Sequence, residues 1–233
     1  QDDTYAKYIN PFWPDIKIQN FTTLGVDLFY GVQSRATVEN TQYYTSEWVK
    51  NNMLCHGSLG ALERVWGDGK QMSPGDKTDY FGLSGYTDDQ LKKQGYMVWM
   101  PVQAKGSFLA EGDDLCFLNL IGNGLDAWKD DTYGGWAGVN YPVPDNMKKT
   151  WSYFPSATIQ KICGFPDYTA AVQNDLAARL AWSVTSDYKS VNHEPVINGL
   201  EAIIAKPGQK ITLKCKVSDP DGNKVSLKWY QYH

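Results

Sequence analysis

The sequence predicts an α/β domain over residues 1–190, followed by the start of a β domain over residues 195–233. The α/β class rests on a clear amphipathic helix over residues 167–183, in a chain that also carries short apolar strand candidates. The β domain rests on three strand-like runs separated by turns that contain Pro and Gly. A length of 233 residues is enough for two medium domains with a sizeable core.

The first half of the chain alternates short elements with Gly-rich segments. Residues 12–18 and 25–30 have the pattern of short strands or loops, because Pro and Gly interrupt them. A capped helix is expected from Thr45 to Met53, and the glycines of Cys55–Gly60 are expected to end it. Residues 66–90 are rich in Gly, Asp and Ser and predict a long surface loop. Residues 96–101 predict a strand.

The second half of the α/β domain contains an acidic stretch, an aromatic region and the clear helix. An apolar run follows Asp113 and Asp114, so one of them is expected to cap a short buried helix that ends at Gly122 or Gly124. Residues 126–158 hold many Gly, Pro, Trp and Tyr without periodicity and predict irregular loops packed over a cleft. In the helix over 167–183, the apolar residues Val172, Leu176 and Leu180 are four apart. Gln173 and Asn174 lie on the opposite, polar side, and Asp175 forms an i,i+4 ion pair with Arg179.

The polar stretch Thr185–Pro195 separates this helix from the β segment, and His193 within it is expected to be an interdomain or solvent residue. Strands are predicted over residues 201–205, 210–217 and 225–232, with turns at Lys206–Gly208 and Asp219–Asn223. Trp229 on the third strand favours the start of an immunoglobulin-like sandwich, a fold of about seven strands. The segment is either a three-stranded appendage packed on the main domain or the front portion of a domain completed elsewhere, and we expect the second.

The amino-acid composition limits the classes of partner that this chain is expected to bind. Aromatic residues make up 14% of the chain, which suits either stacking on flat partners such as sugar rings or filling of the core. The net charge is −4 without a basic cluster, so nucleic acid is not an expected partner. No apolar run approaches the roughly 20 residues of a membrane span, and none is expected. The four cysteines are far apart and are expected to be buried free thiols, with disulfides of undetermined pairing as the alternative for an exported protein.

Three carboxylates, Glu111, Asp113 and Asp114, make residues 111–125 the most informative stretch of the chain. One interpretation is helix capping, which free backbone N–H groups and the helix dipole favour. The other is a cation site, because one carboxylate is enough for a cap and the mutual repulsion of three must be relieved. Calcium, which prefers several oxygen ligands, would relieve it.

Three further residues are candidates for substrate binding, each with a structural alternative. His56 could hydrogen-bond a substrate hydroxyl or shuttle a proton, or it could simply close the preceding helix. Trp136 lies between glycines that permit close approach of a ligand, so it could stack on a sugar ring or close the core as a lid. Asn123 could bind a sugar hydroxyl or terminate the helix.

Six short motifs occur along the chain, at Cys55–Gly60, Glu111–Asp113, Asn123–Leu125, Gly134–Gly138, Gln173–Asp175 and Asn192–Pro195. In this order they resemble the cellulose-binding, nucleoside-hydrolase-like family of secreted bacterial proteins. The resemblance implies a nucleoside-hydrolase-like α/β domain, of which this chain holds the C-terminal part, followed by an immunoglobulin-like domain. It also implies a periplasmic or extracellular location and a missing N-terminal half of the same protein.

The resemblance implies site roles and leaves two functions open. Asp113 is similar to the late aspartate ligand of the nucleoside hydrolase calcium site, with Glu111 or Asp114 nearby and the general base expected outside this chain. The first hypothesis is a hydrolase of glycosyl bonds, in which calcium-bound water attacks the anomeric carbon of a carbohydrate or nucleoside-like substrate. The alternative is a non-catalytic protein that binds a cellulose-like polysaccharide and uses Trp136 as a stacking platform. Fold-level resemblance does not decide between them.

Overall fold

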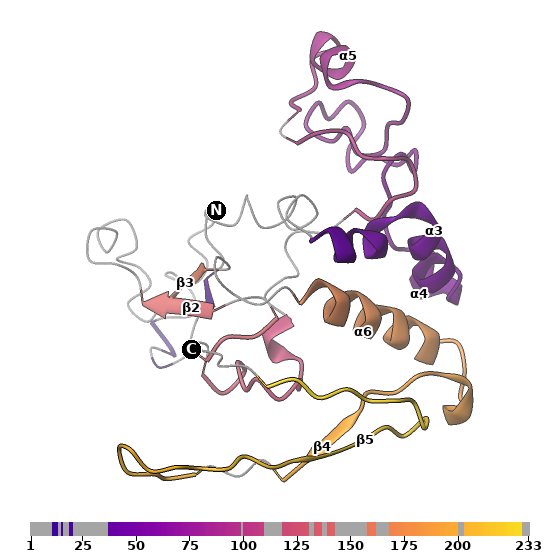
Figure 1. Ribbon diagram of the computed structural model, residues 1–233. Helices are drawn as coiled ribbons and strands as arrows, with labels where there is room; N and C mark the ends of the chain where they lie inside the picture. Colours follow the sequence, from indigo (N-terminus) through magenta and orange to yellow (C-terminus); the bar gives the residue numbers. More distant parts are fainter. Residues whose placement is uncertain are drawn as a thin grey trace.

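The structure is a computed structural model that describes residues 11–13, 15, 19–20, 37–98, 100–109, 118–130, 133–136, 139–142, 158–161, 168–199 and 203–229. A helical layer forms its centre, with a long excursion on one side and a C-terminal strand pair on the other (Figure 1). The helical elements of these residues are η3 (Val38–Tyr44), α3 (Ser46–Val49), η4 (Lys50–Leu54), α4 (Gly57–Gly60), α5 (Asp88–Lys93), α6 (Thr169–Trp182) and η8 (Tyr188–Ser190).

The predicted helix from Thr45 to Met53 is confirmed as α3 followed directly by the π-helical turn η4. The Thr45 hydroxyl caps it by accepting a hydrogen bond from the Trp48 N–H at 3.3 Å. The glycines do not simply end the helix, as the sequence suggested. Gly57 adopts a left-handed φ of +64°, which reverses the chain, and the short helix α4 then begins at that residue.

Helix α6 packs against α3 and η4 and confirms the helix expected over residues 167–183. Val49, Met53 and Leu180 form the buried cluster between these elements. The predicted ion pair is also present, with Arg179 Nε 2.6 Å from Asp175 Oδ2. The polar side is different from the prediction, because Gln173 is only 2% exposed and its amide nitrogen donates to the Tyr43 carbonyl at 3.3 Å.

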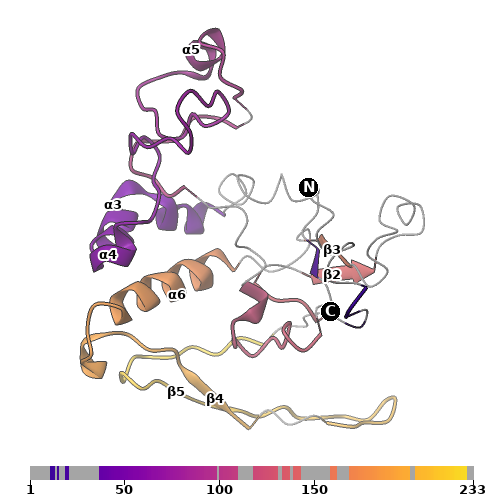
Figure 2. The same cartoon turned by 180° about the vertical axis from the view of Figure 1, so that it is seen from behind.

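Residues 61–109 form an excursion that carries its own core, away from the helical layer (Figures 1 and 2). This corrects the prediction of a surface loop over 66–90, because three aromatic rings from this region are buried together. The neck of the excursion is closed by a bridge between Val65 and Phe108. Helix α5 lies at the far end and begins with a capping box between Thr87 and Gln90. The buried residues are Trp66, Tyr80, Phe81, Leu91, Met100 and Leu109.

The strand predicted over residues 96–101 is wrong for the described residues of that range. Its backbone groups find partners that are not a neighbouring strand. The Met97 N–H donates to the Lys77 carbonyl at 2.8 Å, and the Met100 N–H donates to the Tyr80 hydroxyl at 3.1 Å. Three of its side chains, those of Tyr96, Val98 and Met100, instead pack into the core of the excursion, whereas Met97 is exposed.

A small mixed sheet is formed by β1 (Gln19–Asn20), β3 (Thr158–Lys161) and β2 (Val139–Pro142), in the order β1-β3-β2. Strand β1 runs parallel to β3, pairing Gln19 with Thr158, whereas β2 is antiparallel to β3 and pairs Val139 with Lys161. Strand β2 lies within residues 126–158, so the prediction that this whole region is irregular is corrected.

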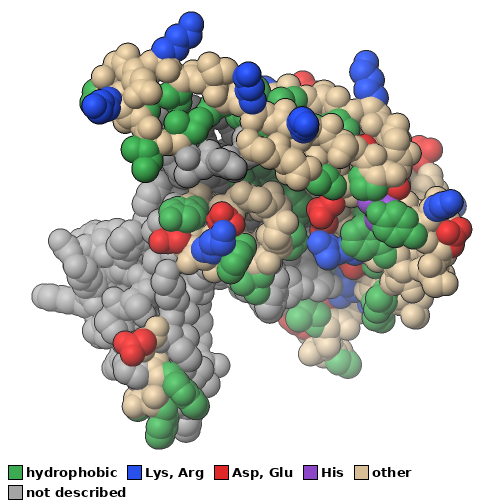
Figure 3. Space-filling view, turned by 90° about the horizontal axis from the view of Figure 1, so that it is seen from below, with side chains coloured by type: hydrophobic (Ala, Val, Ile, Leu, Met, Phe, Trp, Pro, Cys, Tyr) green, Lys and Arg blue, Asp and Glu red, His purple; other side chains and the backbone are tan. Residues whose placement is uncertain are grey.

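The C-terminal segment contains the antiparallel strands β4 (Val196–Asn198) and β5 (Lys216–Ser218), which run alongside α6 (Figures 1 and 2). Both predicted turns are present, at Lys206–Gly208 and Asp219–Asn223. The strands predicted over 201–205 and 225–232 are wrong for their described residues, 203–205 and 225–229, which lie in no strand. Of the strand predicted over 210–217, the structure shows only the end, as β5, and β4 was not predicted. Hydrophobic side chains lie among charged ones on the face seen from below (Figure 3). Exposed ones of this segment are Ile203, Ile204, Ile211, Leu213, Leu227 and Trp229.

Candidate functional site

The structure brings together two segments that carry predicted site residues, those of Asn123 and Trp136. The two segments touch at Gly135, where an added Cβ would lie 2.5 Å from Asn119 Oδ1 and 2.9 Å from Ala127 Cβ. Glu111 and Asp113, with Asp114, lie outside the described residues. The predicted calcium ligand and its acidic neighbours therefore stay predictions.

The side chain of Asn123 stabilises a turn through its oxygen, while its nitrogen has no hydrogen-bond partner among the described residues. Its Oδ1 accepts the Leu125 N–H at 3.1 Å, which supports the structural interpretation. Its side-chain nitrogen is buried and has no hydrogen-bond partner among the described residues, so a ligand hydroxyl could still satisfy it. Trp136 is half-buried, whereas Trp128 in the same loop is 53% exposed, with the Lys129 ammonium 5.1 Å from its ring centroid.

His56 lies apart from this loop, at the junction of α4 with the C-terminal end of α6. It occupies the N-cap position of α4, and its Nδ1 is 3.4 Å from the Cys55 sulfur. At the next residue, Gly57, an added Cβ would be 2.7 Å from Val184. Cys55 is an exposed free thiol and Cys215 a half-buried one, so the expectation of buried thiols is wrong for Cys55.

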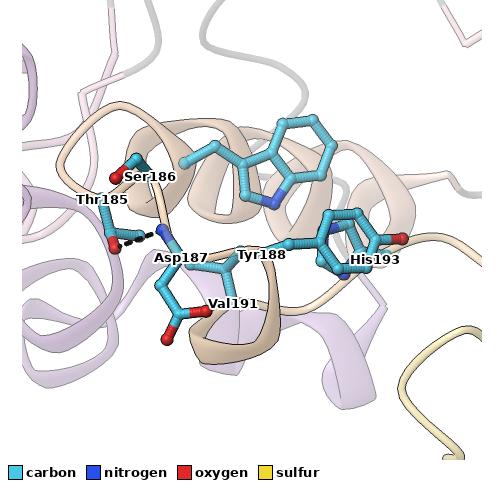
Figure 4. Close-up of a pocket in the computed structure, with 7 residues that line it drawn as sticks. Thr185, Ser186, Asp187, Tyr188, Val191 and His193 are labelled. Carbon is cyan, nitrogen blue, oxygen red and sulfur yellow. Dashed lines mark hydrogen bonds between the residues drawn. The ribbon is translucent and has the colours of Figure 1, made fainter.

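A pocket that the sequence did not reveal lies at the C-terminal end of α6 (Figure 4). Its volume is about 330 Å³. It is built largely from the polar stretch that was predicted as a connection between two domains. The lining residues are Trp182, Thr185, Ser186, Asp187, Tyr188, Val191 and His193.

Aromatic rings form one side of the pocket. The His193 ring stacks on Tyr188 with 3.6 Å between centroids and an interplanar angle of 17°. It is also nearly parallel to the Trp182 ring, at 5.9 Å and 17°. Figure 4 shows the Tyr188 and His193 rings overlapping at one end of the site. The Trp182 indole N–H donates to the Asn192 carbonyl at 2.9 Å, so α6 and the following chain hold each other in place.

Short-range hydrogen bonds fix the loop on the opposite side. The Thr185 hydroxyl accepts the Asp187 N–H at 3.1 Å, and the Asp187 carboxylate accepts the Lys189 N–H at 3.1 Å. The second contact caps η8 and orients Tyr188. Thr, Ser and Asp at this spacing are a sequence signal for such turns, and this signal could have indicated a structured loop.

His193 links the pocket to the C-terminal segment. Its Nδ1 is 2.9 Å from Asp221 Oδ1, and its backbone N–H donates to Asp221 Oδ2 at 2.6 Å. Hydrogen bonds from the His193 side chain and then from its backbone lower the pKa of Asp221 below its ordinary value of 3.8. With its side chain only 14% exposed, His193 fits the interdomain alternative of the prediction rather than the solvent one.

The described residues contain neither a cluster of metal-ligating side chains nor a membrane-spanning helix. Within those ranges, no three His, Cys, Asp or Glu side chains gather in a way that could hold a metal ion. None of the helices that the structure describes combines the length and the hydrophobicity that crossing a bilayer requires.

Comparisons with known proteins place the chain in a family. Residues 1–140 match the family described as "Cellulose-binding Sde182, nucleoside hydrolase-like domain". A solved structure of a nucleoside hydrolase-related hypothetical protein from Saccharophagus degradans, associated with carbohydrate metabolism, is 20% identical, with a TM-score of 0.48. The match covers 96% of this chain and 45% of that one. No curated protein matches. Because the family match spans more than half of the sequence, the chain belongs to the cellulose-binding Sde182, nucleoside hydrolase-like family.

Proposed function

We propose that this chain binds a cellulose-like polysaccharide and that the pocket at the end of α6 receives one of its sugar units. The observation that carries the proposal is the set of nearly parallel rings of Trp182, Tyr188 and His193 beside a loop rich in hydroxyl groups. The family description, which names cellulose binding, supports the same class of ligand.

The chemistry of the pocket suits a sugar ring. Pyranose rings present flat C–H faces that pack on aromatic side chains, and their hydroxyl groups need hydrogen-bond partners at the edges. Tyr188 is 59% exposed, so part of its ring is available for stacking. Thr185 and Ser186 supply hydroxyl groups at the margin. A volume of about 330 Å³ is at the lower end of ligand sites, which suits one sugar unit better than several.

A polysaccharide could also contact the loop that carries Asn123 and Trp136. Trp128 of this loop is exposed, and the buried amide nitrogen of Asn123 is a spare donor among the described residues. These features support roles for Asn123 and Trp136 in substrate binding, with Glu111 as a neighbour in sequence. A protein that binds an external polysaccharide acts outside the cytoplasm, so we propose a periplasmic or extracellular location.

Calorimetric titration with cellohexaose tests the proposal. Tyr188→Ala should weaken binding by up to about tenfold, because an aromatic stacking contact contributes about 0.5–1.5 kcal/mol and 1.4 kcal/mol corresponds to a factor of ten. Tyr86→Ala is the matched control, since Tyr86 is an exposed tyrosine of the excursion. Unchanged affinity in Tyr188→Ala, or no binding by the unmodified protein, would reject this site.

Calcium-assisted hydrolysis is the second candidate function, favoured by the nucleoside hydrolase-like family. The described residues do not form a calcium site, so it rests on Asp113 and Glu111, with the general base outside this chain. Calcium titration of the unmodified protein and of Asp113→Ala tests it, and saturable binding that the substitution abolishes is the expected result. Binding of cellohexaose without calcium uptake would favour the non-catalytic function. In either case we propose residues 195–233 as an immunoglobulin-like spacer.

A further inference from the structure

We propose that Asp221 is a positioning residue for the pocket: from the C-terminal segment, it holds the His193 ring against Tyr188. The identity of the ligand rests on the proposed function, whereas the positioning of the ring does not. The inference gives the C-terminal segment a part in the binding site beyond that of a spacer.

Asp221 contacts His193 at two places at once. One carboxylate oxygen accepts the backbone N–H at 2.6 Å, and the other lies 2.9 Å from the ring nitrogen Nδ1. A contact to the backbone fixes where the residue sits, and a contact to the ring fixes how the side chain is turned. Together they set the plane that stacks on Tyr188 at 3.6 Å.

The turn that carries Asp221 is itself held in shape. Asp219 Oδ1 accepts the N–H groups of Asp221 at 2.9 Å and of Asn223 at 3.1 Å. Asn223 in turn donates to the side-chain oxygen of Asn192 at 3.1 Å, next to His193. The turn therefore forms hydrogen bonds with two consecutive residues of the linker, Asn192 and His193, which argues against a chance surface contact.

These contacts continue into the pocket wall. The Asn192 carbonyl accepts the Trp182 indole N–H, so one hydrogen-bonded path runs from the C-terminal turn through the linker to α6. Trp182 and His193 both line the pocket. A change at Asp221 should consequently alter the aromatic side of the site without altering the cluster of Val49, Met53 and Leu180 that packs α6.

The contact between Asp221 and His193 also determines which tautomer the neutral His193 imidazole adopts. A carboxylate at Nδ1 requires the hydrogen to be on Nδ1, which leaves Nε2 as the acceptor. Other ionisable groups of this region include Asp187 and Tyr188 in the pocket, Lys189 and Glu194 beside them in the chain, and Arg179, whose guanidinium lies 5.7 Å from the Trp182 ring. Asp221 is the one that hydrogen-bonds the His193 ring among the described residues.

NMR spectroscopy of the His193 ring tests the positioning directly. In the unmodified protein, stacking on Tyr188 should move the ring proton signals upfield, and the ¹⁵N shifts should report hydrogen on Nδ1. Asp221→Ala should abolish the upfield shift. Asp221→Asn should move the hydrogen to Nε2, because the single amide oxygen is needed to accept the His193 backbone N–H and the amide NH2 then donates to Nδ1. Asp89→Asn, an equivalent change on α5, should leave both signals unchanged. Unaltered signals in both Asp221 variants would overturn the proposal.

Cellohexaose calorimetry then connects the positioning to binding. Asp221→Ala should lower affinity as much as His193→Ala does, and the double variant should be no weaker than either single variant, because the two residues act as one unit. Affinity that stays unchanged in Asp221→Ala while the ring signals change would overturn the role in the pocket. If the unmodified protein binds no cellohexaose, the proposed function fails, and the NMR result alone decides whether Asp221 positions the ring. Far-UV circular dichroism of each variant checks that α6 is retained.

Discussion

Replacing Gly135 by Ala should destabilise the protein, because the two halves of the Asn123 and Trp136 loop meet at this residue. The added Cβ would lie 2.5 Å from Asn119 Oδ1 and 2.9 Å from Ala127 Cβ, both well inside normal contact distance. Asn119 is 1% exposed and Ala127 is buried as well, so neither side chain can swing into solvent. The backbone must move instead, and overpacking of this kind costs about 1–3 kcal/mol.

An opposing effect comes from the unfolded chain. Alanine restricts it more than glycine does and stabilises the folded state by about 0.4–1 kcal/mol where the native backbone suits it. Setting the overpacking cost against this gain leaves a net loss of stability in Gly135→Ala of about 0–2.6 kcal/mol, with a central value of about 1.3 kcal/mol. Gly122→Ala is the control within the same loop, since its added Cβ would meet no atom within 4 Å. Its stability should be equal to or slightly above that of the unmodified protein.

Urea unfolding followed by tryptophan fluorescence measures both variants, and Trp136 beside the substitution provides a local signal. A shift of the midpoint to lower urea in Gly135→Ala alone is the expected result. Equal midpoints for Gly135→Ala and Gly122→Ala would refute the claim that the two segments pack closely at this glycine.

Three further predictions concern the helices and the C-terminal turn. Leu180→Ala should cost about 2–5 kcal/mol in urea unfolding because it empties the buried cluster between α6 and α3, and a cost below about 1 kcal/mol would contradict that packing. Thr87→Ala should cost about 1 kcal/mol by removing the cap of α5, and hydrogen exchange should speed up within Asp88–Lys93 while Thr169–Trp182 stays protected. Because hydrogen bonds lower the pKa of Asp221 below 3.8, its contact with His193 stabilises the fold above that pH, and this stability disappears as pH falls through the lowered pKa. Acid titration of Asp221→Asn should lack this part of the pH dependence, and identical curves would exclude it.

Local patterns predicted the helices well. The apolar spacing of Val172, Leu176 and Leu180 gave α6, and Thr45 before a helical pattern gave the start of α3, because both signals depend only on near neighbours along the chain. The burial of Gln173 was missed, since it depends on the Tyr43 carbonyl, a partner 130 residues away. The strand over 96–101 was predicted wrongly for a similar reason, because a tyrosine hydroxyl replaced the expected strand partner.

The same distinction between local and distant contacts applies to the candidate site. Asn123 and the glycine-flanked Trp136 could be identified from sequence, and the structure places their segments together. The pocket at the end of α6 could not, because its side chains are ordinary for a polar linker. The contact that holds the His193 ring is made by Asp221, 28 residues further along the chain, and no local sequence pattern predicts such a pair. The acidic residues Glu111 and Asp113 lie outside the described residues, so their roles stay predictions.

The closed neck of the excursion has a consequence for how this sequence can change. Residues 64–66 and 106–109 are joined by hydrogen bonds and by the bridge from Val65 to Phe108, while these two side chains also pack on the cluster between α3 and α6. The excursion starts and ends at this neck and has its own core of aromatic rings. Insertions or deletions within the excursion therefore leave the distance between residues 64–66 and residues 106–109 unchanged. We therefore expect this part of the molecule to tolerate changes in length while the helical layer keeps its form.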